Sequence, residues 1–579
     1  MAGMLCLAFL IRIAAFISIK NSIYYDYMLW DEKIYHHLAV QILNGTWNSK
    51  AVYEFAPLPA YFMALLYKIF TPDINILRVA NVFFGAFTCL FTGLVGFELK
   101  GKRTAVLAFA VSVFYTPFIF YSVVPLKTSL SVFIFSVFIW LFFKTMNYPS
   151  RLWPYAVLGI FMGMMVNIRP NYLVLVPIVY LFLIVTGYFE TRSVKKICAG
   201  TLVLTTGFIL AISPFVLRNY LVTGKIALTT SQTGFNLFIG NNPDNKIPYY
   251  RPVSFASSSP IKQGLQFNIE ASRRAGKSLS AQEASSFWSK VVVEYAVNQP
   301  DAFFYKILQK TLIFFNRFEA GDHYHIGFMS DHVKFFRLPM IGFWVILPFG
   351  IVGLMAGFGE NKKISAGTLI FLVYGLSLII FFCNTRYRLP MLVILIPAAV
   401  YGIEKLILLA GQKRYKKMAF LFSVAIVFFI IEFLPVTGTD DVTAYYNTHA
   451  VVLKNKGRMR EAIQYWEISS KMNKPFSAFA NLSLARFYRS KGDSGKSNQY
   501  LNMISKDSFG VSHKYSMQGD HARNMGDMKK AVYYYRKSLQ INYGEREVWK
   551  KLITTLNEVD RSAVSEEIEK YKTILDFYR

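Results

Sequence analysis

Residues 104–124 read Thr-Ala-Val-Leu-Ala-Phe-Ala-Val-Ser-Val-Phe-Tyr-Thr-Pro-Phe-Ile-Phe-Tyr-Ser-Val-Val and contain no charged side chain. A helix needs about 20 predominantly apolar residues to cross the hydrocarbon core of a bilayer. This stretch therefore predicts a membrane-spanning helix, and the basic run Lys-Gly-Lys-Arg at 100–103 marks its polar end.

Most of the chain repeats this pattern. The protein has 579 residues, of which 54% are hydrophobic and 17% aromatic, so it is more apolar than an ordinary soluble domain. We predict an all-α fold with a polytopic transmembrane domain over residues 1–436 and about eleven spans. These spans are 2–19, 77–98, 104–124, 128–145, 153–168, 171–187, 197–217, 335–357, 365–383, 389–410 and 417–435.

Every second connection between these spans is short, and four of the short connections are basic: 100–103, 192–196, 362–363 and 412–417. Cytoplasmic loops are enriched in Lys and Arg, so we assign these four to the cytoplasm, together with the N-terminus. The loops 20–76 and 218–334 and the tail from about 437 are then external or periplasmic. This topology describes a multi-pass protein of the cell (inner) membrane.

The formal charge of +29 is explained by this topology, so we expect no nucleic-acid partner. Arg169-Pro170-Asn171 interrupts the two shortest spans, and one broken helix over 153–187 would reverse the side of everything that follows. The basic connections argue against that alternative. The first apolar run has no basic n-region and no obvious cleavage site, which indicates a retained span and not a signal peptide.

Neither a metal nor another cofactor is indicated by the sequence. The four cysteines lie in or beside predicted spans without metal-ligand spacing, so we expect neither disulfides nor zinc. A divalent metal is compatible with the chain but nothing in it requires one. The cysteines are Cys6, Cys89, Cys198 and Cys383.

The tail becomes polar from about residue 437. A glycine turn followed by a small side chain five residues later recurs about every 34 residues, which is the tetratricopeptide period. The three recurrences are Gly457–Ala462, Gly492–Ser497 and Gly526–Ala531. We predict an α-helical tetratricopeptide solenoid over 437–579, whose concave face would bind a protein partner. Generic helical hairpins are the alternative.

The first external loop carries an acidic pair, Asp31-Glu32, followed by residues 33–43 with apolar side chains at helical spacing. Such a helix lies along the membrane surface, which puts both carboxylates at its N-terminus. One interpretation is that they only favour the helix dipole. The other is chemical, because abstracting a proton from a hydroxyl needs a carboxylate within hydrogen-bond reach.

Four arginines fall at external boundaries, where the positive-inside rule does not expect them: Arg169, Arg218, Arg386 and Arg388. A phosphate group would compensate them, because guanidinium binds phosphate with two parallel hydrogen bonds. Each one taken singly could instead snorkel to lipid headgroups. We expect Arg388 and Arg218 to matter most, since each adjoins an apolar span and an aromatic residue or proline.

The order of these features resembles the GT-C membrane glycosyltransferases, most of all the dolichyl-phosphate-mannose protein mannosyltransferase and aminoarabinose transferase superfamily. The likeness starts with a span, the acidic pair with Tyr35 four residues after Asp31, and the Ala-Pro-Leu-Pro turn at 56–59. It extends in order over residues 1–435, and bacterial members with a tetratricopeptide tail look similar over the full length. The further blocks are Gly159–Gly163, Arg169–Asn171, Pro214–Tyr220, Gly234–Pro243 and Arg386–Pro390.

The resemblance implies a membrane glycosyltransferase that takes sugar from a polyprenyl-phosphate-linked donor, with inverting attack by an acceptor hydroxyl. The implied partners are that donor, membrane lipids and an acceptor glycan, lipid or protein. By position, Asp31 would be the catalytic base and Glu32 the second candidate, while the four external arginines would bind the donor phosphate. Glu319 stands where relatives carry an acidic residue and would position the acceptor or a cation, unless it merely pairs with Arg317.

Two positions depart from the family pattern. Phe55 stands where relatives often have a basic residue, and Lys127 stands near a position where many have a second carboxylate. The missing carboxylate puts metal assistance and catalytic competence in doubt. Lys127 would then bind the donor phosphate instead.

Three other functions stay open. A degenerate transferase core could anchor the repeats as a non-catalytic scaffold, which the missing carboxylate favours. An O-antigen polymerase or ligase also has many spans and a large external loop, although the early acidic loop fits that class less well. A transporter or flippase would require polar residues at mid-membrane in two related halves, and the sequence has no such halves.

The topology makes a direct prediction. A reporter that is active only outside the cytoplasm should be active when fused after Arg579 and silent when fused after Lys102, because the parity of spans assigns these positions to opposite sides. The reverse pattern would invert the topology and remove the arginines from the donor side.

Overall fold

The computed structural model describes residues 1–47, 49, 51–321, 324–338, 340–439, 441–505, 508, 510–559 and 564–570. Over these residues the chain is helical and has no β-strand, which confirms the all-α prediction; an isolated bridge joins Tyr115 to Ile341. The helices form two compact units that alternate along the chain. Unit 1 contains residues 1–230, 246–249 and 301–437, and unit 2 contains residues 231–245, 250–300 and 438–579.

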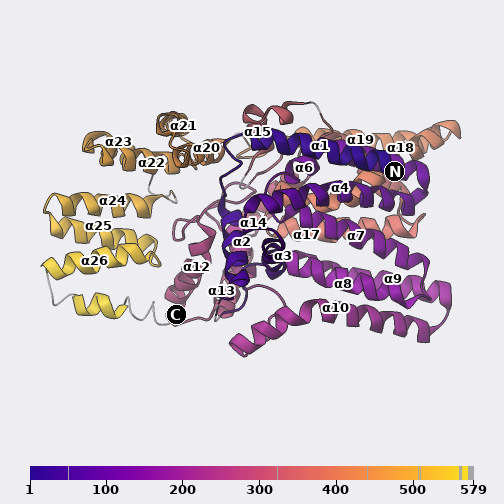
Figure 1. The fold of residues 1–579 in the computed structure, drawn as a ribbon, viewed down its shortest axis with the longest axis horizontal. Helices are drawn as coiled ribbons and strands as arrows, with labels where there is room; N and C mark the ends of the chain where they lie inside the picture. Colours follow the sequence, from indigo (N-terminus) through magenta and orange to yellow (C-terminus); the bar gives the residue numbers. More distant parts are fainter. Residues whose placement is uncertain are drawn as a thin grey trace. The chain divides into compact units, whose positions relative to one another are not determined.

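Unit 1 is a bundle of long helices, several of which run side by side in Figure 1. Within it, α4 packs against α1, α5 and α7, while α8 packs against α10 and α16 against α18. Its elements are α1 (Ala2–Lys20), α2 (Trp30–Leu43), α3 (Pro57–Ile69), α4 (Ile74–Lys100), α5 (Lys102–Phe114), α6 (Thr116–Tyr121), α7 (Thr128–Asn147), α8 (Leu152–Ile168), η1 (Pro170–Leu175), α9 (Val176–Thr191), α10 (Val194–Thr223), α14 (Pro300–Phe315), α15 (Ile326–His332), η2 (Lys334–Arg337), α16 (Phe343–Gly357), α17 (Lys362–Ile380), α18 (Thr385–Gly411) and α19 (Tyr415–Phe433).

Seven helices of the described chain are long and apolar enough to cross a membrane. They are Ala2–Lys20, Ile74–Lys100, Thr128–Asn147, Pro170–Thr191, Val194–Thr223, Lys362–Ile380 and Thr385–Gly411. The other four predicted spans are helical but shorter or more charged: α5 with α6, α8, α16 and α19. The structure therefore supports seven membrane spans by helix length and composition. The count of eleven stays a prediction.

Two predicted spans differ from the observed helices for local reasons. The stretch 104–124 is not one helix, because Tyr115 is extended and its neighbours exchange backbone hydrogen bonds with Ile341 before α6 starts with Pro117 in its first turn. The predicted span 335–357 begins as a helix only at Phe343, after Gly342 in an extended conformation.

The chain reverses at Arg169, as its Pro170 neighbour suggests. Arg169 is extended, with φ −143° and ψ 110°, so α8 ends at Ile168 and η1 starts at Pro170. A residue before proline is biased away from the helical region. The two short spans are thus separate elements and not one broken helix.

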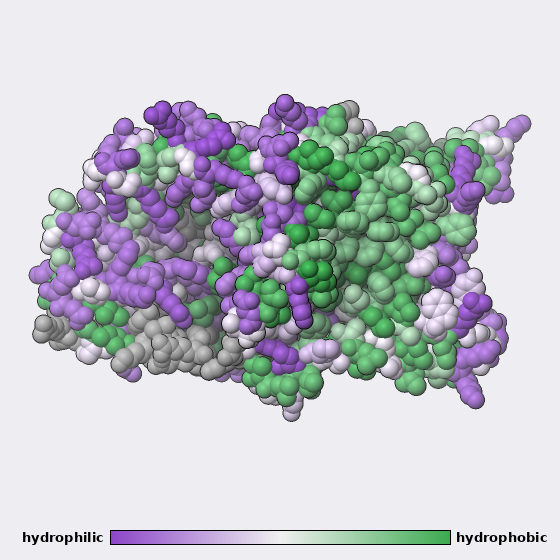
Figure 2. Space-filling model, in the orientation of Figure 1, coloured by the Kyte–Doolittle hydropathy of each residue, from purple (hydrophilic) through white to green (hydrophobic). Residues whose placement is uncertain are grey.

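The basic connections of unit 1 gather at one end of the bundle. Ion pairs link them to acidic residues near the helix ends: Lys100–Glu404 (2.9 Å), Arg103–Glu404 (3.7 Å), Lys363–Glu98 (2.6 Å), Lys417–Glu360 (3.2 Å) and Lys362–Glu190. Figure 2 shows apolar side chains over the middle of this bundle and hydrophilic ones at the end where Figure 1 marks the N-terminus. The connections therefore share one end, as the alternating topology requires; the side of the membrane stays a prediction.

Unit 2 joins part of the long loop to the tail. Its helices are α11 (Thr233–Asn241), α12 (Pro260–Ala275), α13 (Ala281–Asn298), α20 (Thr443–Asn455), α21 (Met459–Lys471), α22 (Ser477–Ser490), α23 (Ser494–Asn502), α24 (Val511–Asn524), α25 (Met528–Ile541) and α26 (Arg546–Val559). Lys262 of α12 pairs with Glu545 at 3.3 Å, and the Gln266 side chain donates to the carbonyl of Gly544. Residues 231–245 and 250–300, predicted as external loop, thus belong to the compact unit that holds the tail.

The predicted glycine turns of the tail are present. Gly457, Gly492 and Gly526 have φ of 76°, 80° and 79°, a region that glycine enters without strain. The small residues five positions later are buried between paired helices, since Ala462, Ser497 and Ala531 have no exposed surface. These hairpins agree with the repeat pattern, and a tetratricopeptide solenoid remains a prediction; residues 560–563 and 571–579 of its range lie outside the described residues.

Close packing of α16 on α18 gives a stability prediction. A Cβ at Gly353 would lie 1.8 Å from the carbonyl oxygen of Ala398, and backbone cannot move aside as a flexible side chain can. Gly353→Ala should therefore destabilise the protein by about 1–3 kcal/mol, the usual effect of overpacking. Gly3→Ala is the matched control, because nothing lies within 4 Å of that position. Equal melting temperatures for the two purified variants would contradict the packing.

Candidate functional site

The end of α18 away from the basic connections meets the ends of three other elements. Arg386 lies in the first turn of α18, Asp31 in the first turn of α2, Lys127 directly before α7, and Arg169 between α8 and η1. Glu404 pairs with Lys100 and Arg103 at the basic end of the bundle. It follows Arg386 by 18 residues along α18, which is about 27 Å at 1.5 Å per residue. The structure therefore brings four of the predicted site residues together, far from the basic end.

The carboxylate of this cluster is already paired. Nη1 of Arg386 donates to Oδ2 of Asp31 at 2.8 Å, and the two side chains are 8% and 18% exposed. Nη2 of Arg386 also reaches the hydroxyl of Tyr387 at 3.4 Å. Arg386 thus holds the Asp31 carboxylate, part of which remains exposed to water.

Arg169 is buried without a matching acceptor. It is 3% exposed, and its guanidinium lies 4.6 Å from the ring centre of Tyr387, which Arg386 approaches at 5.2 Å. Among the described residues, Nε and Nη1 of Arg169 have no hydrogen-bond partner. Leaving buried donors unpaired costs free energy, so this fork of N–H groups points to an acceptor supplied by a ligand.

Lys127 faces the same space. Its Nζ donates to the hydroxyl of Tyr35 at 2.7 Å and lies 4.9 Å from the centre of that ring. Burial, and then the positive charge of Arg169, lower the pKa of the Lys127 amine to about 7, although Asp31 acts in the opposite direction. Burial, and then the charge of Asp31, raise the pKa of the Tyr35 hydroxyl.

In the part of the chain that the structure describes, three cationic side chains therefore share this cluster with one carboxylate. Arg169, Lys127 and Arg386 exceed Asp31 by two formal charges, and all are at least partly buried. Such a surplus suits a phosphate group, which guanidinium and ammonium groups bind through charge-assisted hydrogen bonds. Among the described residues, no three His, Cys, Asp or Glu side chains are grouped as a metal site would need.

Glu32 lies next to Asp31 but is used differently. It is 1% exposed, and its Oε2 accepts from the backbone N–H of Leu29 at 2.6 Å, which caps the N-terminus of α2. Its Oε1 accepts from the hydroxyl of Tyr324 at 2.7 Å. Glu32 thus fixes the helix that carries Asp31, and both of its oxygens are engaged in doing so.

Arg388 and Glu319 form a separate group. Arg388 follows Arg386 by two residues, about half a helical turn, so the two side chains leave α18 on different faces. Nη1 of Arg388 donates to the carbonyls of Phe314 and Asn316 at 3.0 and 2.7 Å, and Nη2 donates to Oε2 of Glu319 at 3.0 Å. The guanidinium also lies 3.8 Å from the ring centre of Phe343. Its fork is filled by the protein, so Arg388 joins α14 to α18 and Glu319 neutralises it.

Arg218 is likewise occupied. Its two terminal nitrogens donate to the carbonyls of Ala51 and Ser49, both at 2.6 Å, and its guanidinium lies 4.8 and 4.6 Å from the rings of Trp47 and Tyr53. These contacts tie α10 to the first loop. Of the two arginines expected to matter most, neither has a fork that is open in this structure.

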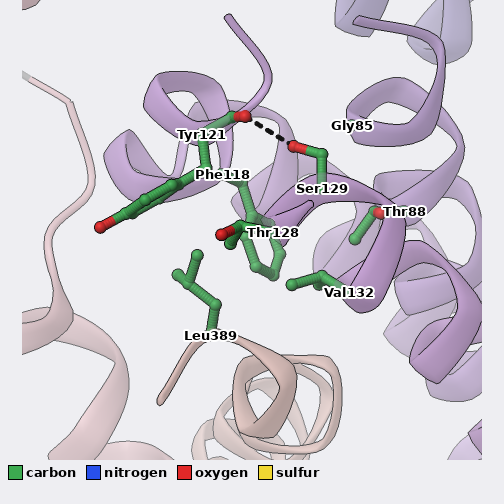
Figure 3. Close-up of a pocket in the computed structure, with 8 residues that line it drawn as sticks. All are labelled: Gly85, Thr88, Phe118, Tyr121, Thr128, Ser129, Val132 and Leu389. Atoms are coloured by element: carbon green, nitrogen blue, oxygen red, sulfur yellow. Dashed lines mark hydrogen bonds between the residues drawn. The ribbon is translucent and has the colours of Figure 1, made fainter. Parts of the chain in front are cut away.

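A small cavity lies beside the start of α7 and is lined by residues that include Thr128, Ser129 and Leu389 (Figure 3). Its volume is about 10 Å³, enough for one water molecule and far too small for a sugar. The buried hydroxyl of Thr128 has no partner among the described residues, while Ser129 donates to the carbonyl of Tyr121. This cavity is large enough for a structural water and too small for the expected ligand, so the cluster is the better candidate for a ligand site.

The sequence indicated two further members of the cluster only indirectly. Tyr35 follows Asp31 by four residues and so shares its face of α2, and Tyr387 separates the two arginines of Arg386–Pro390. Neither was expected to contact a cation. The contacts show that Tyr35 orients Lys127, while the Tyr387 ring lies within 5.2 Å of both guanidinium groups.

No protein-family model matches the sequence, and no curated protein matches it. Among solved structures, it is similar to the oligosaccharyltransferase of Archaeoglobus fulgidus in the apo form, with 14% identity and a TM-score of 0.42 over 79% of this chain and 59% of that one. It is also similar to AglB of the same organism in complex with an inhibitory peptide and a dolichol-phosphate, with 13% identity, a TM-score of 0.42 and the same coverage. The chain thus spans 59% of the length of these neighbours.

The different surroundings of the arginines predict different tolerance to lysine. Lysine keeps the charge but loses the planar fork, so Arg388→Lys and Arg218→Lys should each lose carbonyl hydrogen bonds and destabilise the protein by about 1–3 kcal/mol. Arg169→Lys should change the melting temperature little, because Nε and Nη1 of Arg169 have no acceptor in the described part of the chain. A larger loss at 169 than at 388 would show that the open fork is wrongly identified.

Proposed function

We propose that this chain is a membrane glycosyltransferase of the GT-C kind, which transfers a sugar from a polyprenyl-phosphate-linked donor to an acceptor hydroxyl on the external side of the membrane. The observation that carries the proposal is the cluster of Asp31 with Arg169, Lys127 and Arg386 at one end of a bundle of apolar helices. It combines a carboxylate with an excess of positive charge where a lipid-anchored phosphate would arrive.

The positive side chains would bind the donor phosphate. Arg169 offers an unused fork, and Arg386 and Lys127 add one cation each from other elements. When the bond between sugar and phosphate breaks, negative charge develops on the departing oxygen. Preorganised cations at that position stabilise the transition state more than the ground state, which lowers the barrier.

Asp31 would act as the base toward the acceptor hydroxyl. Its pairing with Arg386 at 2.8 Å makes it a poor base while no donor is bound, because the guanidinium stabilises the carboxylate. A bound phosphate would compete for Arg386 and free Asp31 at the moment it is needed. This exchange favours donor binding before proton abstraction and protects the donor from premature attack.

Unit 2 would recruit the acceptor or a protein partner. Its hairpins carry the predicted repeat turns, and stacked repeats of this kind present extended binding surfaces. The charges of the cluster would select the phosphate. They do not select the sugar, the length of the lipid or the acceptor.

A non-catalytic scaffold is the second candidate. The observation in its favour is the stretch that ends in Lys127, which stands near the position where many relatives have a second carboxylate. The two candidates differ in what happens to cell-surface sugars when Asp31 is altered and the chain still folds.

The test uses a deletion strain complemented with single variants. Asp31→Asn should lose transfer by about 10²–10⁴-fold, the usual cost of removing a general base, while the protein level is unchanged. Mass spectrometry of surface glycans and glycoproteins should then match the deletion strain. Asp26→Asn, an exposed acid of the same loop, is the matched control and should restore the parental pattern. Parental glycans with Asn at position 31 would contradict the mechanism and favour the scaffold.

A further inference from the structure

Lys127 differs from the two arginines in one respect that matters for chemistry: it can give up a proton. Guanidinium stays charged in proteins, whereas an ammonium group exchanges its proton when its surroundings disfavour the charge. One of its three N–H donors is used by the hydroxyl of Tyr35 at 2.7 Å. The others are left for a ligand held by Arg169 and Arg386.

We propose that Lys127 is the general acid of this site and donates its proton to the phosphate oxygen that leaves the sugar. The proposal rests on the function proposed above. The bond between the anomeric carbon and the phosphate oxygen breaks, and the new bond forms from that carbon to the acceptor oxygen. The acceptor proton goes to Asp31 and the Lys127 proton goes to the leaving oxygen. The phosphate therefore departs as a monoanion, and the total charge of the site is unchanged.

The position of Lys127 carries this assignment. The backbone before it is anchored by α4, since Asn81 donates to the carbonyls of Val124 and Leu126 at 2.9 and 3.0 Å. Arg78 of the same helix donates to the carbonyl of Val123 at 2.9 Å. These bonds hold the loop rigidly, so the ammonium group presents its proton from a fixed direction, as a general acid must.

The groups that face Lys127 set how readily it releases that proton. They are Asp31 and Tyr35 from α2, Arg169 from the connection after α8, and Arg386 from α18. Asp31 pairs with Arg386, and no ion pair joins Lys127 to a carboxylate of the described residues. Burial beside two guanidinium groups lowers the pKa of Lys127 to about 7, near the second pKa of a phosphate monoester, about 6. A nearly balanced transfer is the efficient case for general acid catalysis.

The sign of the pH dependence follows from these values. Below about pH 7 Lys127 already carries its proton, so anion binding is insensitive to pH. Above that value the neutral amine must take up a proton when an anion binds. The affinity should then fall by up to about tenfold for each pH unit between the pKa of the free and the bound site.

Sulfate is a suitable probe, because it imitates a phosphate group but does not titrate between about pH 6 and about pH 9. Sulfate binding to the purified full-length protein would be followed by isothermal titration calorimetry in two buffers of different ionisation enthalpy. The difference between the buffers measures proton uptake. The wild type should take up nearly one proton at about pH 8 and almost none at about pH 6.

Two substitutions separate charge from proton transfer. Lys127→Arg keeps the charge but cannot release a proton, so sulfate should bind within about threefold of wild type, without proton uptake, while sugar transfer falls by about 10²-fold or more. Lys127→Met should weaken binding by about tenfold or more and also abolish uptake. Lys144→Arg, at the other end of α7, is the matched control and should behave as wild type.

The outcomes distinguish this inference from the proposed function. If wild type binds no sulfate at any pH, the anion site is wrong and both fall. If wild type binds sulfate without proton uptake, or Lys127→Arg still takes up a proton, the acid is not Lys127 while the anion site stands. Full transfer activity in Lys127→Arg would overturn the inference in the same way.

Discussion

The apolar middle of unit 1 is the constraint from which its other features follow. A charge in hydrocarbon is costly unless it is paired or reaches water, so the ionised groups of the bundle collect at its two ends. At one end, lysines of three basic connections (100–103, 362–363 and 412–417) pair with Glu98, Glu190, Glu360 and Glu404. Arg12 lies within the apolar helix α1 and is buried. Its guanidinium donates to Ser122, to Cys89 and to the carbonyl of Ala8, which compensates for the loss of water. At the other end, the described residues of the cluster are three cations and one carboxylate, Asp31.

The sequence predicted this division well because hydropathy and charge placement are local properties. Most of the apolar runs are single helices in the structure, and the chain reverses at Arg169-Pro170, where a residue before proline is biased away from the helical region. The break at Tyr115 escaped prediction because it depends on Ile341, more than 200 residues away. The assignment of residues 231–300 to the external loop missed their contacts with the tail for the same reason, since Gln266 and Gly544 meet only in the folded chain.

The candidate site shows where local reasoning stops. Asp31 and Arg386 were each found by position, but their pairing across 355 residues could not be. Glu32 looked equivalent to Asp31 in sequence, and Tyr324 together with the capped Leu29 distinguishes the two. The predicted order of the arginines was based on neighbours in sequence, whereas the structure separates them by their acceptors. Arg388 and Arg218 bind backbone carbonyls, and Nε and Nη1 of Arg169 find no acceptor over the residues that the structure describes.

The arginines at this end of the bundle therefore fall into two kinds: those that stabilise the fold and those that could bind a ligand. Arg388 donates its N–H groups to backbone carbonyls, so it needs no acceptor from a ligand. It can therefore fix α18 to α14 without competing for a phosphate. The Arg169 guanidinium lies beside Tyr387, and two of its nitrogens have no acceptor among the described residues. Hydrogen bonds from these nitrogens would therefore form only when a ligand binds. The Asp31–Arg386 pair differs from both, because Arg386 donates to a carboxylate that is still partly exposed to water. Under the proposed function, this is the contact that an incoming anion would exchange.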